Sequence, residues 1–292
     1  MHDKRIGRFG QIKIYIGKCF RSFLNEKGWK SLITTLIVAV ILSWVIGGNT
    51  FKVFENTRSG AFAMICGCIW TGLFNSIQSI CRERQIIKRE HRTGLHISSY
   101  VVAHLIYEFV LCVAEAVILT GVFDLFRTFP KDGILFGWTG LEFLISFTLV
   151  IFCADALGIM ISCIVKTQNA AMTVMPFVLI IQLVMSGMMF KLPEKADGVK
   201  ELTISKWGLT SICCTADVTK LPTAKEIAMQ QEGSAVSIPS TQAEIETMEQ
   251  YKKEYKASTS NILQCWGVLG GYSVLYGALG ILFLKLVDKD KR

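Results

Sequence analysis

Residues arranged to bind nucleotides or metals are scarce in this sequence. No stretch fits the phosphate-binding pattern G-x-x-x-x-G-K-[ST], because Gly17 and Lys18 lack the earlier glycine and are followed by Cys19. The four histidines do not stand with cysteines or carboxylates at metal-ligand spacing, and Cys66 and Cys68 form a C-x-C pair with no second pair. We therefore expect no catalytic site, metal or cofactor in this chain, so any use of ATP must come from elsewhere.

Charged residues are also few. They make up 18% of the 292 residues, against 51% hydrophobic residues, and the mean hydropathy is +0.44. This composition excludes an ordinary soluble domain, and the length allows several membrane helices. A cleavable signal is lacking as well, because the first apolar run begins only near Ser31 and no small-residue cleavage pattern follows it. We expect that first run to be retained as a membrane span.

The chain does contain six apolar segments, each near the roughly 20 residues that cross a bilayer. They lie at about 31–48, 59–80, 99–123, 138–164, 170–190 and 263–286. Only residues 166–169 separate the fourth segment from the fifth. The sequence therefore predicts an all-α polytopic membrane protein with six transmembrane helices, five of them within residues 31–190 and the sixth, with a tail, within 263–292.

The basic residues fall mainly on one side of these segments. Eighteen Lys/Arg flank that side, four flank the other, and the remaining nine lie in the long loop before the last segment. By the positive-inside rule this distribution predicts that both termini are cytosolic, in a multi-pass protein of the plasma membrane. The net charge is +8, but its position beside apolar spans favours anionic lipid headgroups rather than nucleic acid as the partner.

Residues 1–30 combine basic side chains with an apolar stripe. Eight Lys/Arg stand against Asp3 and Glu26. Apolar side chains recur at the spacing of one helix face, at Ile12, Ile16, Cys19, Phe20 and Phe23. This pattern predicts a cytosolic amphipathic helix lying at the membrane surface, and the alternative is a solvated basic tail.

A dense charge cluster separates the second and third segments. Between Arg82 and Arg92 it holds five Lys/Arg and two Glu, which cannot lie in hydrocarbon, where each central charge costs roughly 2.5 to 3.5 kcal/mol. Ile86 and Ile87 stand between two acid–base pairs with helical spacing. Residues 82–93 are therefore predicted to form a short cytosolic helix that presents charge to a partner.

Residues 191–262 form a long segment outside the predicted spans. Thr241 and Glu244 fit a capping box, which predicts a helix from Thr241. The segment either caps the outer mouth of the membrane part or forms a tethered mobile loop, and both readings are open. Cys213 or Cys214 could pair with Cys265 in an oxidising exterior, but spacing alone does not establish a disulfide.

Three carboxylates lie within the predicted spans, where ionisable groups are costly. Glu108 and Glu115 share one face of the third segment, and Asp155 stands beside the small residues Ala154 and Gly158 in the fourth. Such a small-residue stripe allows close helix packing, so we expect Asp155 to face a neighbouring helix. Each carboxylate has either a structural, hydrogen-bonded role or a place on a transport path.

Together these features resemble the membrane half of an ABC exporter of the ABC-2 type permease superfamily, the class that includes the subfamily G half-transporters, with a bacterial origin favoured. Three short motifs in the same order as in the family carry the resemblance. They are Glu83-Arg84 with Arg89-Glu90, Gly94, Tyr100 and Glu108; the run QLVMSGMMF from Gln182 to Phe190; and Ser205-Lys206-Trp207-Gly208.

The resemblance implies roles that composition does not show. Residues 1–30 would be the family's connecting helix, and residues 82–93 the coupling helix that docks on an ATPase. The implied ATPase-coupling residues are Glu83, Arg84, Ile87, Arg89 and Glu90. The implied substrate cavity between two protomers is lined by Trp70, Phe74, Asn75, Leu179 and Gln182. The implied apolar valve above it is Met188 and Met189.

The same resemblance implies partners. Family members of this type usually carry the ATPase on the same chain, so here it would be a separate subunit or a removed domain, holding ATP and Mg. Six spans make half a pore, so a second permease protomer is expected. The path would move a hydrophobic or amphipathic substrate outward. A rival interpretation is a membrane-anchored sensor or assembly protein that binds a partner through its outer loop without transport.

Overall fold

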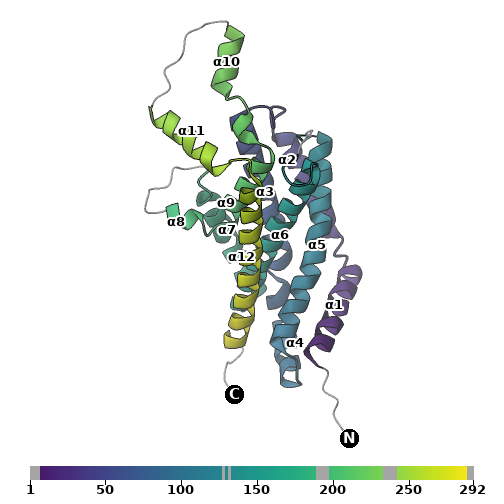
Figure 1. The fold of residues 1–292 in the computed structure, drawn as a ribbon. Helices are drawn as coiled ribbons and strands as arrows, with labels where there is room; N and C mark the ends of the chain where they lie inside the picture. Colours follow the sequence, from purple (N-terminus) through teal and green to yellow (C-terminus); the bar gives the residue numbers. More distant parts are fainter. Residues whose placement is uncertain (1–6, 127–128, 131–132, 189–196, 233–241, 288–292) are drawn as a thin grey trace.

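The computed structural model describes residues 7–126, 129–130, 133–188, 197–232 and 242–287. These residues are helical and contain no strand. Figure 1 shows long helices side by side, with α1, α4 and the end of α12 at one end of the bundle and α10 and α11 at the other. The all-α prediction is confirmed.

A sharp elbow joins the first two helices. α1 (Arg8–Asn25) and α2 (Lys30–Val45) are bent by 69° relative to each other. Lys27 at the elbow has a φ of 58°, and a Cβ on the next residue, Gly28, would lie 2.3 Å from the ring of Phe23. α1 packs along α5, so the amphipathic helix expected at the N-terminus is part of the bundle rather than a free tail.

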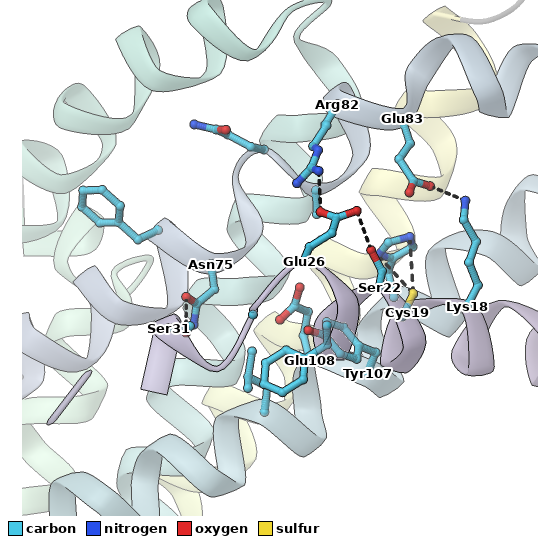
Figure 2. Close-up of a pocket in the computed structure, with 17 residues that line it drawn as sticks. Lys18, Cys19, Ser22, Glu26, Ser31, Asn75, Arg82, Glu83, Tyr107 and Glu108 are labelled. Atoms are coloured by element: carbon cyan, nitrogen blue, oxygen red, sulfur yellow. Dashed lines mark hydrogen bonds and ion pairs between the residues drawn. The ribbon is translucent and has the colours of Figure 1, made fainter. Parts of the chain in front are cut away.

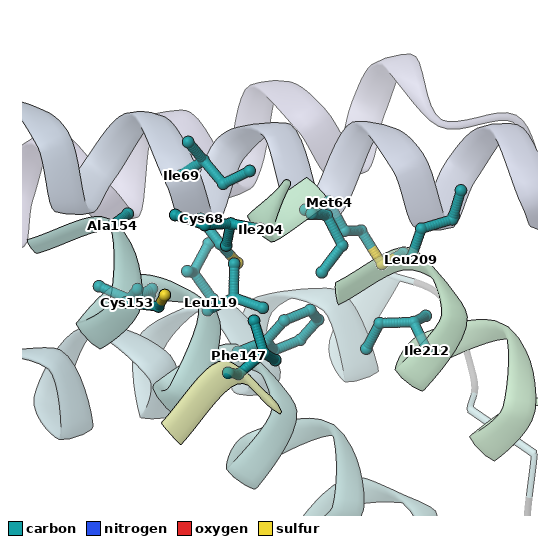
Figure 3. Close-up of a cluster of buried hydrophobic side chains, with 14 of the residues drawn as sticks. Met64, Cys68, Ile69, Leu119, Phe147, Cys153, Ala154, Ile204, Leu209 and Ile212 are labelled. Atoms are coloured by element: carbon teal, nitrogen blue, oxygen red, sulfur yellow. The ribbon is translucent and has the colours of Figure 1, made fainter. Parts of the chain in front are cut away.

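Four long helices form the centre of the bundle. They are α3 (Phe54–Ser76), α5 (Ile97–Phe126), α6 (Thr139–Ile164) and α12 (Thr259–Val287). α6 lies between the other three, and its contacts to α3 depend on small residues. Gly72 of α3 stands against the Ile151 carbonyl, and Gly158 of α6 against Ser76, so the stripe read from the sequence does allow close packing. Figure 3 shows the buried side chains that fill this centre, including Met64, Cys68, Leu119 and Phe147.

Six membrane spans are not confirmed. Four helical segments of the described chain are long and apolar enough to cross a bilayer, namely α5, α6, α12 and the continuous stretch of α3 and α4, and the bent pair of α1 and α2 makes a fifth at most. α7 (Gln168–Val184) follows the predicted break after α6, but it has 17 residues and an internal proline, Pro176. At about 1.5 Å per residue α7 is shorter than the roughly 30 Å hydrocarbon layer.

The segment before α12 is more helical and more buried than expected. It contains α8 (Asp197–Lys200), α9 (Ile204–Thr215), the 3-10 helix η2 (Val218–Lys220), α10 (Ala224–Glu232) and α11 (Gln242–Glu254). The helix predicted from Thr241 is α11, although Thr241 itself lies outside the described residues. α9 is inserted against α3, α6 and α12, where Gly208 leaves room for Ile65 and Val150. α9 therefore belongs to the core of the bundle.

The cysteines near α9 are not bonded to one another. Cys213, Cys214 and Cys265 are buried free thiols. Cys214 instead accepts a hydrogen bond from the Asn261 side chain at 3.1 Å. The disulfide that the sequence left open is therefore absent from the described structure.

Candidate functional site

The charge cluster of the sequence forms α4 (Ser79–Arg92), a helix with two different faces. The helix begins against α6, because the Ser162 hydroxyl accepts hydrogen bonds from the first-turn N–H groups of Ile80 and Cys81 at 3.1 and 3.0 Å. It ends at Arg92, and the chain turns away at Gly94, whose φ of 111° suits glycine, with the Leu95 N–H bonded to the Glu90 carbonyl at 3.0 Å. Both ends are therefore fixed by the bundle.

The inner face of α4 is anchored through a buried arginine and a buried isoleucine. Arg84 donates to the carbonyl of Val165, at the end of α6. Ile87 is fully buried in a cluster with Tyr100, Ile159 and Leu284. Both residues were implied to contact an ATPase, and the structure instead turns them into the bundle.

Glu83 connects α4 to α1 and α5. Its Oε2 accepts hydrogen bonds from Lys18 Nζ and from the Tyr100 hydroxyl, each at 2.7 Å. Glu83 is therefore a hydrogen-bonded link between three helices.

Glu90 and the loop after α4 complete the attachment to α1. The Tyr15 hydroxyl donates to Glu90 Oε2 at 2.7 Å. The Gln11 side chain donates to the Gly94 carbonyl at 3.1 Å and accepts from the His96 N–H at 2.9 Å. Together with Lys18, these contacts make α1 and α4 one unit.

The outer face of α4 carries the exposed side chains. Gln85, Ile86, Arg89 and Arg92 are exposed, and of the five residues implied to couple to an ATPase only Arg89 is among them. Arg82 is exposed too, and it pairs with Glu26 at the elbow. Gln85, Ile86 and Arg92 were not among the residues implied to couple to an ATPase. The helical period alone does not determine which of the adjacent Ile86 and Ile87 faces the bundle, so it could not identify the exposed face.

A cavity of about 370 Å³ lies where α1, the elbow, α3, α4 and α5 meet. Figure 2 shows Glu26, Glu83, Glu108 and Asn75 around it. Hydrogen bonds from Ser22 and Arg82 hold the pKa of Glu26 below its ordinary value. The cavity is polar on the α4 side and has aromatic walls elsewhere, including Phe74 and Tyr107.

The three carboxylates of the predicted spans occupy different environments. Glu115 accepts hydrogen bonds from Ser31 and Asn75, each at 2.8 Å, and so joins α2, α3 and α5. Asp155 is buried and accepts from Cys112 at 2.6 Å. Glu108 lines the cavity and has an oxygen without a hydrogen-bond partner in the described chain.

The residues implied to line a two-protomer cavity lie on two adjoining helices. Trp70 and Phe74 stack at 5.8 Å on the exposed side of α3, and α7 runs beside α3. Leu179 is half-buried, whereas Gln182 is buried and its Oε1 accepts from the Ile204 N–H of α9 at 2.9 Å. Asn75 is half-buried and bonded to Glu115.

The implied valve lies just beyond α7. Met188 is half-buried against the core after Gly187, whose φ is 72°. Met189 lies outside the described residues. The described residues bring no three His, Cys, Asp or Glu side chains together as metal ligands.

Two comparisons with known proteins show which family the chain resembles. Residues 10–199 match the family model described as "ABC-2 type transporter". The chain is also 26% identical over 225 residues, 73% of its length, to the ABC transporter ATP-binding/permease protein Rv1747 of Mycobacterium tuberculosis, and it spans about a quarter (26%) of that relative's length. The matched region includes α4, the elbow and the helices around the cavity, and the apolar helices make this a multi-pass membrane protein. The chain therefore belongs to the ABC-2 type transporter family.

Proposed function

We propose that this chain is the membrane domain of an ATP-driven transporter and that the outer face of α4 receives the motion of an ATPase. The observation that carries the proposal is the division of α4 into an anchored face and an exposed face. Arg84, Ile87 and Glu83 fix one side to the bundle, while Ile86 and Arg89 stand free at the surface. A partner can therefore hold α4 without breaking its internal contacts.

Motion imposed on α4 passes to the membrane helices through these anchors. α4 is bonded to α1 and α5 through Glu83 and to α6 through Ser162. A rigid-body shift of α4 therefore displaces three helices together, which is the kind of movement that opens and closes a transport path. A substrate biases such an equilibrium only through different affinities for the two states.

The remaining components of the proposed transporter are supplied by partner proteins. A separate or fused ABC ATPase holds ATP and Mg, which fits the name of the mycobacterial relative, an ATP-binding/permease protein. A second permease protomer completes a path between the α3 and α7 faces, lined by Trp70, Phe74, Asn75, Leu179 and Gln182, below Met188 and Met189. The substrate is hydrophobic or amphipathic and moves outward, with α4 and both termini on the cytosolic side of the plasma membrane.

The test is the ATPase rate of the candidate ATPase reconstituted in lipid with this chain. Ile86→Ala combined with Arg89→Ala removes exposed side chains and leaves the anchors intact. We expect the effect of the chain on the ATPase rate to fall by about tenfold, the equivalent of roughly 1.4 kcal/mol of coupling. Lys52→Ala, an exposed cation outside α4, serves as the control and should behave as wild type.

A second outcome favours the rival function. If no ATPase binds, or if the double variant couples like wild type, the outer face of α4 is not a transmission surface. The membrane-anchored sensor interpretation then gains support, and α10 and α11 become the surface to test for a partner.

A further inference from the structure

The cavity between α1 and α5 has the dimensions of a ligand site. Its volume of about 370 Å³ equals roughly a dozen water molecules at about 30 Å³ each and falls in the lower range of small-molecule pockets. It lies within one chain and shares only Phe74 and Asn75 with the path proposed between two protomers. Residues from α1, the elbow, α2, α3, α4 and α5 form its walls.

The charged groups of the cavity leave one carboxylate without a basic partner. Lys18 is paired with Glu83 at 2.7 Å, and Arg82 is paired with Glu26. The third carboxylate of the lining is Glu108, for which no ion pair occurs within the described chain. His104 also lines the cavity, but its ring lies 3.8 Å from the Cys19 sulfur. The cavity therefore has an excess of one acidic group.

Glu108 is buried and directed into the cavity. Its exposed fraction is 3%, and its Oε2 has no hydrogen-bond partner among the described residues. In Figure 2 its carboxyl group points into the space between Glu26 and Asn75, with no dashed line to a neighbour. Because burying an unpaired carboxylate is costly, a bound cation that pairs with Glu108 would be stabilised there.

The lining favours an organic cation over a metal ion. The described chain brings no set of three metal-ligating side chains together, and the volume far exceeds that of a bare ion. Phe23, Phe74, Tyr107 and Leu111 supply apolar and aromatic surface next to Glu108. Aromatic faces attract organic cations, and apolar walls accommodate a hydrocarbon body.

We propose that this cavity binds a primary ammonium group carried on an apolar body, with Glu108 as its counter-ion. This chemistry has two sources, the headgroup of a phosphatidylethanolamine lipid or a soluble amphiphilic amine. The site needs neither an ATPase nor a second protomer, and it goes beyond the proposed transport function. Ligand binding in the cavity and coupling to an ATPase are therefore tested by separate measurements, and either proposal can fail without the other.

The first experiment uses the full chain in phosphatidylcholine nanodiscs with dodecylamine as the probe, which is an ammonium ion at neutral pH. Binding of radiolabelled dodecylamine is measured with empty nanodiscs subtracted. We expect Glu108→Gln to weaken binding at least tenfold and Glu108→Asp to weaken it less. Glu249→Gln, an exposed carboxylate on α11, is the matched control and should bind as wild type. The uncharged analogue dodecanol should bind equally to wild type and to each variant.

A wall variant keeps the proposal testable if Glu108→Gln does not fold. Phe23→Ala alters a half-buried aromatic side chain of the wall that is not part of the proposed path, and it should weaken dodecylamine binding several-fold. Thermal unfolding of each variant in the same nanodiscs reports its folding. Dodecylamine binding that is equal in wild type and in every folded cavity variant overturns the proposal.

The second experiment separates the two sources. Replacing half of the phosphatidylcholine by phosphatidylethanolamine should raise the apparent Kd of dodecylamine at least tenfold if the lipid headgroup occupies the cavity. The same replacement should leave that Kd unchanged if the site takes only soluble amines. Either result supports an ammonium site, provided that Glu108→Gln abolishes the binding of dodecylamine. A lipid effect that persists in folded Glu108→Gln overturns the assignment of Glu108.

Discussion

Close packing at a single glycine sets how α3 and α6 meet. A Cβ at Gly72 would lie 2.5 Å from the Ile151 carbonyl oxygen and 2.9 Å from the Ala154 Cβ. Because the first of these atoms belongs to backbone, the helices must move apart to admit a methyl group. A larger residue at this position therefore changes the spacing of two helices that both contact the core.

We expect Gly72→Ala to destabilise the protein by about 1 to 3 kcal/mol, the usual cost of overpacking a filled core. The matched control is Gly121→Ala on α5, where a Cβ would meet nothing within 4 Å. Alanine has the higher helix propensity, so that change should be neutral or stabilising by up to about 1 kcal/mol. Thermal unfolding in nanodiscs measures both. Equal midpoints for the two variants would contradict the packing argument.

At the scale of elements, α11 packs against the bundle through Met248 and Tyr251, and Arg58 adds a polar contact to this attachment. Arg58, in the first turns of α3, lies with its guanidinium carbon 3.9 Å from the centre of the Tyr251 ring, and its Nε donates to the Tyr255 hydroxyl at 3.3 Å. Tyr255 is buried at the end of this segment. A cation over an aromatic ring contributes about 0.5 to 2 kcal/mol depending on burial.

Replacing Arg58 should therefore loosen α11 while leaving the other helices in place. For Arg58→Ala we expect hydrogen exchange in Gln242–Glu254 to become roughly tenfold faster, as a loss of about 1.4 kcal/mol predicts. Arg58→Lys keeps the charge, and we expect a smaller increase. Exchange within α6 is the internal reference. Protection of α11 that is the same in wild type and Arg58→Ala would show that other contacts hold it.

The elements that the sequence predicted well are those whose pattern is local. The charges after Cys81 predicted a helix, which is α4, and the predicted break after the fourth segment falls at residues 165–167, between Ile164 at the end of α6 and Gln168 at the start of α7. What sequence did not reveal depends on tertiary neighbours. α9 has mixed Ser, Thr and apolar residues and is buried only because α3, α6 and α12 surround it. Glu108 likewise became distinct from Glu115 only in the structure, where Oε1 of Glu115 accepts hydrogen bonds from Ser31 and Asn75 while Glu108 lines the cavity.

For the whole molecule, the neighbouring helices α3 and α7 both expose large apolar side chains, which together are called the α3–α7 face. Trp70 and Phe74 are stacked and exposed on α3, and Phe177 and Ile181, one turn apart on α7, are 63% and 54% exposed. α7 is too short to match the hydrocarbon layer alone, so a neighbouring protein surface would shield its ends better than lipid does. This face is accordingly where we expect the proposed second protomer to bind.

Removing the two α7 side chains should separate the protomers without unfolding either one. We expect Phe177→Ala combined with Ile181→Ala to weaken dimerisation at least tenfold, because large apolar side chains dominate the energetics of such contacts. The matched control is Leu275→Ala combined with Leu282→Ala on α12, which removes two side chains that are each 50% exposed. Single-molecule photobleaching in liposomes counts the copies directly. If both double variants dimerise as wild type does, the exposed face of α7 contacts lipid. The five residues of the proposed path, on α3 and α7, then do not enclose a path between two chains.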